Sequence, residues 1–109
     1  MINYEDFIKL DIRVGEIVKA ERFDAARRPA FKLWVDMGGE IGVRQSSAQI
    51  TELYQPEALI GRQVLAVVNF PPKLVAGFRS EVLVLGTYSQ GGVVLVSPER
   101  RVEKGDKLG

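Results

Sequence analysis

The sequence predicts an all-β protein built as a small closed barrel of about five strands, with one short helix between the third and fourth strands. Two observations lead to this prediction: early segments alternate between apolar and polar residues, and three later segments are apolar on both faces. Glycine- and proline-containing turns separate these segments. A chain of 109 residues forms about one hydrophobic core, so we expect a single domain over residues 1–109.

A short helical turn is expected near the N-terminus. Tyr4, Phe7 and Ile8 have helical spacing, and they follow Asn3, a residue type that caps helices. We expect this turn to plug one end of the core.

The first strand is expected over residues 11–20. Its alternation places Arg13 on the polar face and predicts an inward-facing apolar set. That set is Ile12, Val14, Val18 and Ala20. Glu16 is a charged residue at a position where the alternation calls for an inward-facing apolar one. Because it directly follows Gly15, we expect a bulge or a sharp coil in the strand.

The second strand, residues 31–37, places the only tryptophan, Trp34, on the polar face beside Lys32. Gly38-Gly39 then predicts a tight turn into a third strand whose Arg44 projects to the same side as Trp34. For Trp34, ligand binding and packing under a loop or at a dimer contact remain open. For Arg44, the alternative to ligand binding is a cross-strand ion pair with Asp36.

Residues 56–61 predict one helical turn, with proline at its start and glycine at its end. Residues 63–70, 82–85 and 93–96 are then apolar on both faces. Because an antiparallel strand with one solvated face would alternate, these strands need a cover on their second face. The N-terminal turn, the 56–61 helix or a partner subunit could provide it.

This order of elements fits the oligonucleotide/oligosaccharide-binding (OB) fold, whose ligands lie across strands two and three and the adjoining loops. Residues 69–84 predict a binding loop, because two prolines end a strand and Lys73 and Arg79 follow on either side of Gly77. Ser80 and Glu81 are expected to anchor this loop to backbone donors. The candidate site residues are Arg13, Lys32, Trp34, Arg44, Gln45, Ser46, Phe70, Lys73, Phe78, Arg79 and Ser80.

The composition argues against catalysis. The chain contains no histidine and no cysteine, which removes imidazole and thiolate nucleophiles, disulfides and the usual zinc sites. No Gly-x-x-x-x-Gly-Lys phosphate motif occurs either. We therefore expect a protein that binds a ligand without transforming it, with no metal, no cofactor and no ATP-driven step.

Charge and hydropathy limit the partners. Fifteen Lys and Arg residues against fourteen Asp and Glu residues give a net charge of +1, so any nucleic-acid site must be local. The N-terminal residues lack the features of a signal peptide, and no apolar run approaches the roughly 18 residues of a membrane span. We expect a cytoplasmic protein that does not insert into membranes.

Four segments, residues 9–17, 56–64, 67–73 and 77–81, resemble the tRNA-binding domain family. That family includes C-terminal appendices of bacterial methionyl-tRNA synthetases, stand-alone tRNA-binding proteins and the endothelial monocyte-activating polypeptide. Within it, residues 45–50 and 67–72 are most similar to the CsaA group of bacterial secretion chaperones. The resemblance implies an OB fold, a homodimer, and binding of unfolded or precursor polypeptides, with the export ATPase as a further partner.

Two segments depart from the tRNA-binding relatives. Those commonly carry Ser-Glu-Gly-Met where this chain has Ser80-Glu81-Val82-Leu83, and Val/Ile-Ser-Gly-Leu where it has Gln45-Ser46-Ser47-Ala48. We therefore expect an ATP-independent chaperone that captures extended apolar and basic segments. The alternatives are a module that recognises the shape and phosphates of tRNA, and an assembly domain that docks onto a synthetase or another enzyme.

Overall fold

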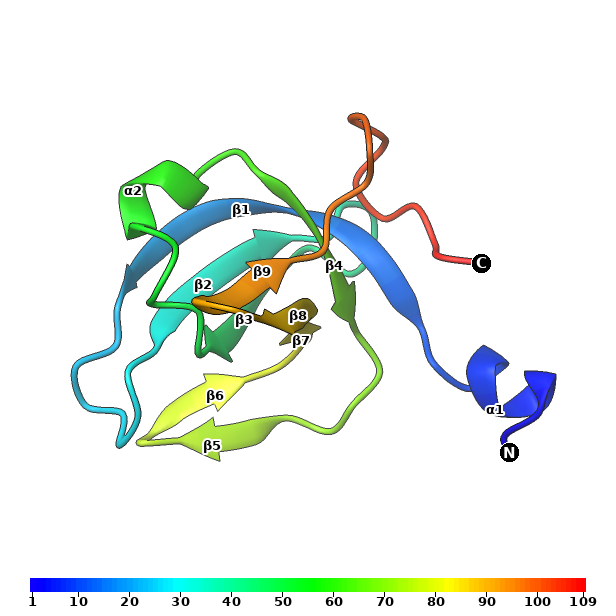
Figure 1. The fold of residues 1–109 in the computed structure, drawn as a ribbon. Helices are drawn as coiled ribbons and strands as arrows, with labels where there is room; N and C mark the ends of the chain where they lie inside the picture. The colour runs from blue at the N-terminus through cyan, green and yellow to red at the C-terminus, as the bar shows by residue number, and fades with distance from the viewer.

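The computed structural model describes residues 1–109 and confirms the all-β, OB-like barrel. Five strands form an antiparallel sheet in the order β3-β2-β1-β4-β7 (Figure 1). They are β1 (Ile12–Arg22), β2 (Phe31–Asp36), β3 (Val43–Ala48), β4 (Gln63–Val67) and β7 (Leu83–Val84). The barrel nearly closes because the backbone N–H groups of Glu81 and Val82 both donate to the carbonyl oxygen of Gln45 on β3, at 2.7 and 3.4 Å.

Two helices and two hairpins complete the fold. The helices are α1 (Tyr4–Ile8) and α2 (Pro56–Leu59), with α2 between β3 and β4 as predicted. One hairpin joins β5 (Lys73–Val75) to β6 (Phe78–Ser80), and the other joins β8 (Gly86–Ser89) to β9 (Gly92–Leu95). No helix has the length and apolar character needed to cross a membrane.

Strand β1 coils from one side of the barrel to the other, pairing first with β4 and then with β2. A Cβ atom on Gly15 would lie 2.5 Å from both Val35 Cγ1 and Met37 Sδ, so only glycine permits this close crossing. A second irregularity lies at Val18, where the register moves from Ile17↔Val35 to Lys19↔Trp34. The prediction that Val18 faces inward is wrong: this bulge leaves it 41% exposed, while Ile17 is fully buried.

The register of β2 and β3 decides which side chains share the outer face. Phe31, Leu33 and Val35 are buried, as the alternation predicted. The prediction that Arg44 lies beside Trp34 is wrong, because Arg44 pairs with Val35 and Gln45 pairs with Trp34. The loop between β2 and β3 is longer than the predicted Gly38-Gly39 turn, since Met37 N donates to Gly42 O at 2.9 Å. The longer loop changes the register by one residue, and such a change moves every side chain to the opposite face.

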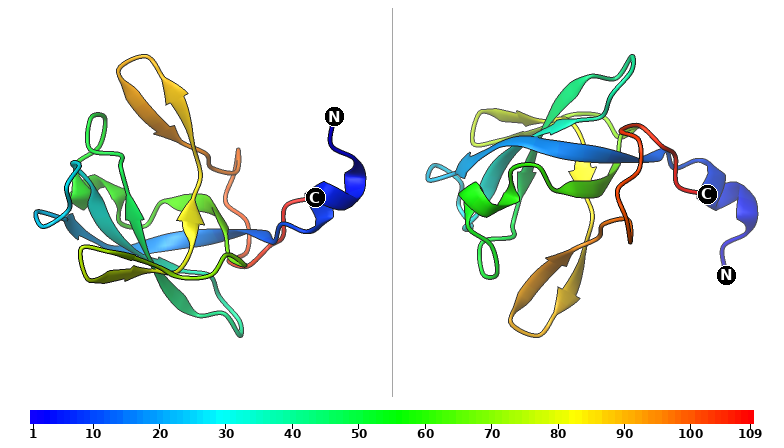
Figure 2. Two further views of the ribbon diagram at one scale, coloured as in Figure 1. Left: turned by 90° about the horizontal axis from the view of Figure 1, so that it is seen from below. Right: turned by 90° about the horizontal axis from the view of Figure 1, so that it is seen from above.

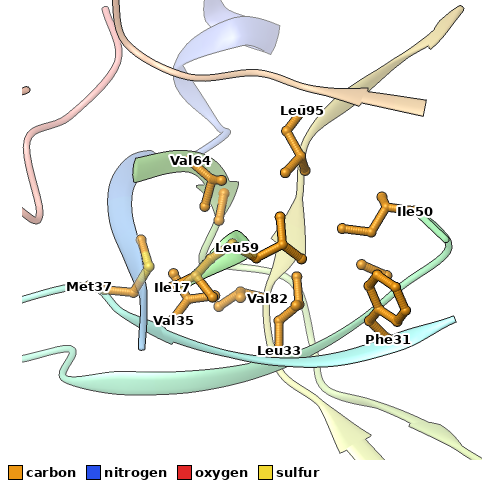
Figure 3. Close-up of a cluster of buried hydrophobic side chains, with 12 residues drawn as sticks. Ile17, Phe31, Leu33, Val35, Met37, Ile50, Leu59, Val64, Val82 and Leu95 are labelled. Atoms are coloured by element: carbon orange, nitrogen blue, oxygen red, sulfur yellow. The ribbon is translucent and has the colours of Figure 1, made fainter. Parts of the chain in front are cut away.

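The main core lies inside the barrel, where side chains from β1, β2, β4 and α2 meet (Figure 3). Leu59 of α2 is fully buried and closes one end of this core. Strand β4 is buried on both faces, as predicted, and its second face packs in a smaller cluster. That cluster contains Ile12, Val14, Leu65 and Val67, with Leu10, Leu85 and Val96 against it.

The prediction that the N-terminal turn plugs the core is wrong. Helix α1 forms, but it has no buried residue and stands away from the barrel (Figures 1 and 2). The C-terminal segment lies along the first half of β1 instead, where Gly105 N donates to Val14 O at 2.7 Å and Leu108 N donates to Ile12 O at 2.8 Å. Tyr4 and Ile8 therefore remain 72% and 53% exposed.

Candidate functional site

Three aromatic rings meet where the β5–β6 hairpin lies against the outer face of the barrel. The ring centroids of Trp34 on β2 and Phe78 on β6 are 5.7 Å apart, and those of Phe78 and Phe23 are 5.4 Å apart. Both pairs are edge-to-face, a favourable geometry for aromatic rings. We call Phe23, Trp34 and Phe78 the aromatic cluster.

Two lysines lie over these rings. Lys19 Nζ is 4.6 Å from the centroid of the Trp34 ring, because the bulge at Val18 pairs Lys19 with Trp34 across the strands. Lys32 Nζ lies 4.9 Å from the Phe23 centroid and 5.2 Å from that of Phe78. Trp34 thus packs under the hairpin and stays half-buried, and the cations over the cluster are held by cation–π attraction.

Side-chain hydrogen bonds fix the β5–β6 hairpin to the backbone of the edge strand β3. Ser47 N donates to Ser80 Oγ and Gln45 N donates to Glu81 Oε1, both at 3.0 Å. In return, Gln45 Nε2 donates to Arg79 O at 2.9 Å. The prediction that Ser80 and Glu81 anchor the loop is confirmed. These bonds satisfy donors that an edge strand would otherwise present to solvent.

A hollow of about 320 Å³ lies at the base of the same hairpin. It is lined by Phe70, Pro71, Lys73, Ser80, Glu81, Val82 and Leu83. Phe70 and Leu83 are each 47% exposed, so the hollow offers apolar surface beside one cation and one carboxylate. Val82 is only 5% exposed and packs in the main core.

Three predicted site residues lie away from this surface. Arg13 is bound by its neighbours, since its Nε donates to Asp11 Oδ1 at 2.8 Å and its Nη1 to Gly105 O at 3.2 Å. Arg44 is on the opposite side of the sheet from Trp34. Ser46 is only 1% exposed, and its buried Oγ has no hydrogen-bond partner. The structure places the other predicted residues, Lys32, Trp34, Gln45, Phe70, Lys73, Phe78, Arg79 and Ser80, on or beside the hairpin.

Sequence reasoning missed Lys19 and Phe23 as members of this surface. Lys19 is exposed, but only the bulge at Val18 places it opposite Trp34. Phe23 directly follows β1 and is only 4% exposed. The first strand was predicted to end at residue 20, so an aromatic residue three positions beyond that end was the one available signal.

A second, larger groove of about 650 Å³ separates the barrel from the β8–β9 hairpin. Its apolar lining includes Ile50, Leu83, Val84 and Val93, and Arg28 and Glu52 also border it. The hairpin projects away from the barrel (Figure 2), and Tyr88 on β8 is 99% exposed. Leu83 lines both this groove and the hollow beside Phe70, so the two adjoin at this residue.

Two ionisable groups with shifted pKa values, Asp36 and Lys104, lie outside this surface. The pKa of Asp36 is lowered below 3.8, first by the backbone N–H of Gly38 at 2.9 Å and then by Lys104. Asp36 in turn raises the pKa of Lys104 above 10.5 through their 3.0 Å hydrogen bond. Asp36 therefore pairs with Lys104 and not with Arg44. No group of carboxylates is arranged to hold a metal ion.

Residues 12–107 match the family model described as "Putative tRNA binding domain". The chain belongs to this tRNA-binding domain family. The methionine–tRNA ligase of Archaeoglobus fulgidus is 38% identical over 107 residues, which cover 98% of the chain but only 16% of the ligase. The chain thus spans about a sixth of that relative's length, where the tRNA-binding domain is an appended part of an enzyme.

Two solved structures resemble the chain over its whole length. The chaperone CsaA of Bacillus anthracis is 55% identical with a TM-score of 0.93, covering 100% of this chain and 99% of that one. The CsaA chaperone protein of Picrophilus torridus is 50% identical with a TM-score of 0.96, covering 100% of both chains. With these relatives, the chain is a non-catalytic binding domain.

Proposed function

We propose that the protein is an ATP-independent chaperone that binds unfolded or precursor polypeptides. The observation that carries this proposal is that two apolar features adjoin one anchored hairpin: the aromatic cluster around Phe78 and the hollow beside Phe70 at the hairpin's base. In the hollow, Phe70 and Leu83 expose apolar surface rimmed by polar groups, which suits a polypeptide whose own apolar residues are not yet buried. The likeness to two proteins named CsaA chaperone supports the same conclusion.

The departure at Val82-Leu83 also supports a polypeptide ligand. Val82 fills the core, and Leu83 adds an exposed apolar wall to both the hollow and the larger groove. A leucine at this wall favours contact with apolar side chains over contact with a sugar–phosphate backbone.

tRNA binding is the second candidate, and two observations favour it. The family model is that of a tRNA-binding domain, and Lys19 and Lys32 lie over aromatic rings on the face where OB folds bind oligonucleotides. Lysines could neutralise phosphates while the rings stack on bases. Such binding should weaken steeply with salt, because neutralised phosphates release counterions.

Truncation of the aromatic cluster tests the polypeptide proposal. Phe78→Ala and Trp34→Ala should each weaken suppression of aggregation of a denatured client, with a loss in affinity of about tenfold, typical of an important interface side chain. Ile60→Ala is the matched control, since Ile60 is apolar and 49% exposed but lines neither the hollow nor the larger groove. Thermal unfolding verifies that each variant is folded.

The same experiment separates the two candidates. Retention of client protein and of tRNA from a lysate is compared at low and high salt. Client retention that persists at high salt and falls in Phe78→Ala supports the chaperone. Retention of tRNA alone, abolished by salt, or client suppression unchanged in both folded variants, would overturn the proposal.

We also propose that the chain forms a homodimer and works in the cytoplasm, where it delivers clients to protein export with the export ATPase as a partner. Exposed apolar residues on α1 support the dimer, since this short helix buries no residue against its own chain. The resemblance to secretion chaperones supports the link to export.

A further inference from the structure

The β8–β9 hairpin carries a strand edge that no other part of the chain covers. All four residues of β8 are exposed, and β8 pairs only with β9. The hairpin extends from the barrel, so solvent reaches the outer side of β8 (Figure 2). Open edges of this kind accept further strands, and proteins usually cover, twist or charge them.

The register identifies which backbone groups are open. Ser89 pairs with Gly92 across a two-residue turn, and Val96 N donates to Leu85 O at 3.1 Å at the other end of the hairpin. Hydrogen-bonded and non-hydrogen-bonded pairs alternate along an antiparallel ladder. The N–H and C=O groups of Gly86 and Tyr88 therefore point away from β9, and no other backbone group bonds to them.

The residues that carry these open groups, Gly86 and Tyr88, are both among the lining residues of the 650 Å³ groove. The opposite wall includes Gln49, the residue directly after β3. Neither its N–H nor its C=O takes part in a backbone hydrogen bond of the turns and loops. At Leu83 the groove adjoins the hollow beside Phe70. A ligand that fills both must be long, extended and able to pair with backbone groups on one side.

We propose that an extended segment of an unfolded polypeptide adds to β8 as a further strand, with its apolar side chains in the groove. This proposal rests on the proposed chaperone function and names the way in which the client is held. Backbone pairing depends little on sequence, which suits a protein with many clients. A nucleic acid lacks the alternating N–H and C=O groups of a strand. A second copy could pair through the same edge, but it would not account for the apolar hollow that adjoins the groove at Leu83.

Two variants at one position test the proposal. Tyr88→Pro removes the outward N–H of residue 88, and the pairing of β8 with β9 does not use that N–H. Tyr88→Ala keeps the N–H and removes the side chain. Gln90→Pro is a proline control in the same hairpin, at the turn position before Gly91, whose φ is 90°. The probe is a short fluorescent peptide of alternating valine and serine.

We expect Tyr88→Pro to weaken peptide binding about tenfold, from one lost hydrogen bond and the blocked approach of the strand, while Tyr88→Ala and Gln90→Pro bind nearly as wild type. In the wild type, the amides of Gly86 and Tyr88 should become protected from hydrogen exchange when the peptide binds. Methylating every second backbone nitrogen gives two peptides, and only one of them loses the N–H donors that face β8. That peptide should no longer bind, whereas the other should.

Three results would overturn this inference. One is equal binding by Tyr88→Pro and wild type, and another is an equal loss in Tyr88→Ala, which would assign the effect to the side chain. The third is dissociation of a dimer by Tyr88→Pro with peptide binding unchanged, which would assign the edge to a second copy. Failure of the wild type to bind any unfolded polypeptide would instead contradict the proposed function itself.

Discussion

Single residues of this protein often serve to fasten loops and termini to the barrel. Asp36 is an example, because its carboxylate accepts from Gly38 N at 2.9 Å and from Lys104 Nζ at 3.0 Å, joining the β2–β3 loop to the C-terminal segment. Asn69 acts similarly, accepting from Asp11 N at 2.9 Å and donating to Lys9 O at 2.8 Å. These contacts link segments that are distant in the sequence.

The Asp36–Lys104 pair makes stability depend on pH. Because folding lowers the pKa of Asp36 below 3.8, its contribution is fully present above that value and is lost as the pH falls through the lower, folded pKa. The raised pKa of Lys104 has the opposite sign: its contribution is present below 10.5 and is lost as the pH rises through the higher, folded pKa.

Asp36→Asn should therefore lower stability modestly at neutral pH, with the difference from wild type shrinking in strong acid below 3.8. Chemical denaturation at neutral and acidic pH measures this. Asp24→Asn is the control, since Asp24 is 86% exposed and only 3.7 Å from Arg22, a weak surface pair. A deficit of Asp36→Asn that is unchanged in acid would contradict this role.

Among the elements, the β5–β6 hairpin contains an unfavourable backbone conformation. Its two turn residues, Ala76 and Gly77, have φ values of 47° and 82°, as a type I′ turn requires. Glycine and asparagine adopt positive φ readily, whereas alanine does so at a cost. The protein thus holds Phe78 of the aromatic cluster on a hairpin with a suboptimal turn.

Ala76→Asn should stabilise this hairpin by about 1 kcal/mol, because Asn-Gly is the preferred pair for such a turn. Hydrogen exchange of the hairpin amides is the measurement, since the hairpin can open without unfolding the barrel. Gly77→Ala should have the opposite effect at the neighbouring position. Equal exchange rates in Ala76→Asn and wild type would show that the turn carries no strain.

The elements also show what the sequence could predict. Alternation placed β2 correctly, because its buried residues follow a strict period of two. It failed for Arg44, since the length of the 37–42 loop sets the register of β3, and alternation does not encode loop length. Lys19 joined the candidate site through a bulge at Val18 that no residue type marked. Ser80 and Glu81 were predicted because their side-chain chemistry alone implies anchoring.

At the scale of the whole molecule, the structure changes the argument for a dimer. The doubly apolar strands suggested a partner subunit, but both faces of β4 are covered within the chain. The uncovered apolar surface lies mainly on α1 and on the outer strands, where Leu83 and Val94 are 47% and 40% exposed. Helix α1 spans only five residues, too few to be stable in isolation.

A partner subunit that covers Tyr4 and Ile8 would explain why this short helix forms. Sedimentation at micromolar concentration should give the mass of a dimer. The double substitution Tyr4→Glu with Ile8→Glu should give a monomer, because the partner subunit would bury two charges that have no counter-charge there. The barrel should persist, since α1 contributes no buried residue to it. Lys9→Glu, a charge change on the adjacent residue with a 78% exposed side chain, should leave the mass unchanged. A monomeric wild type, or a dimer that survives the double substitution, would show that α1 is not the contact.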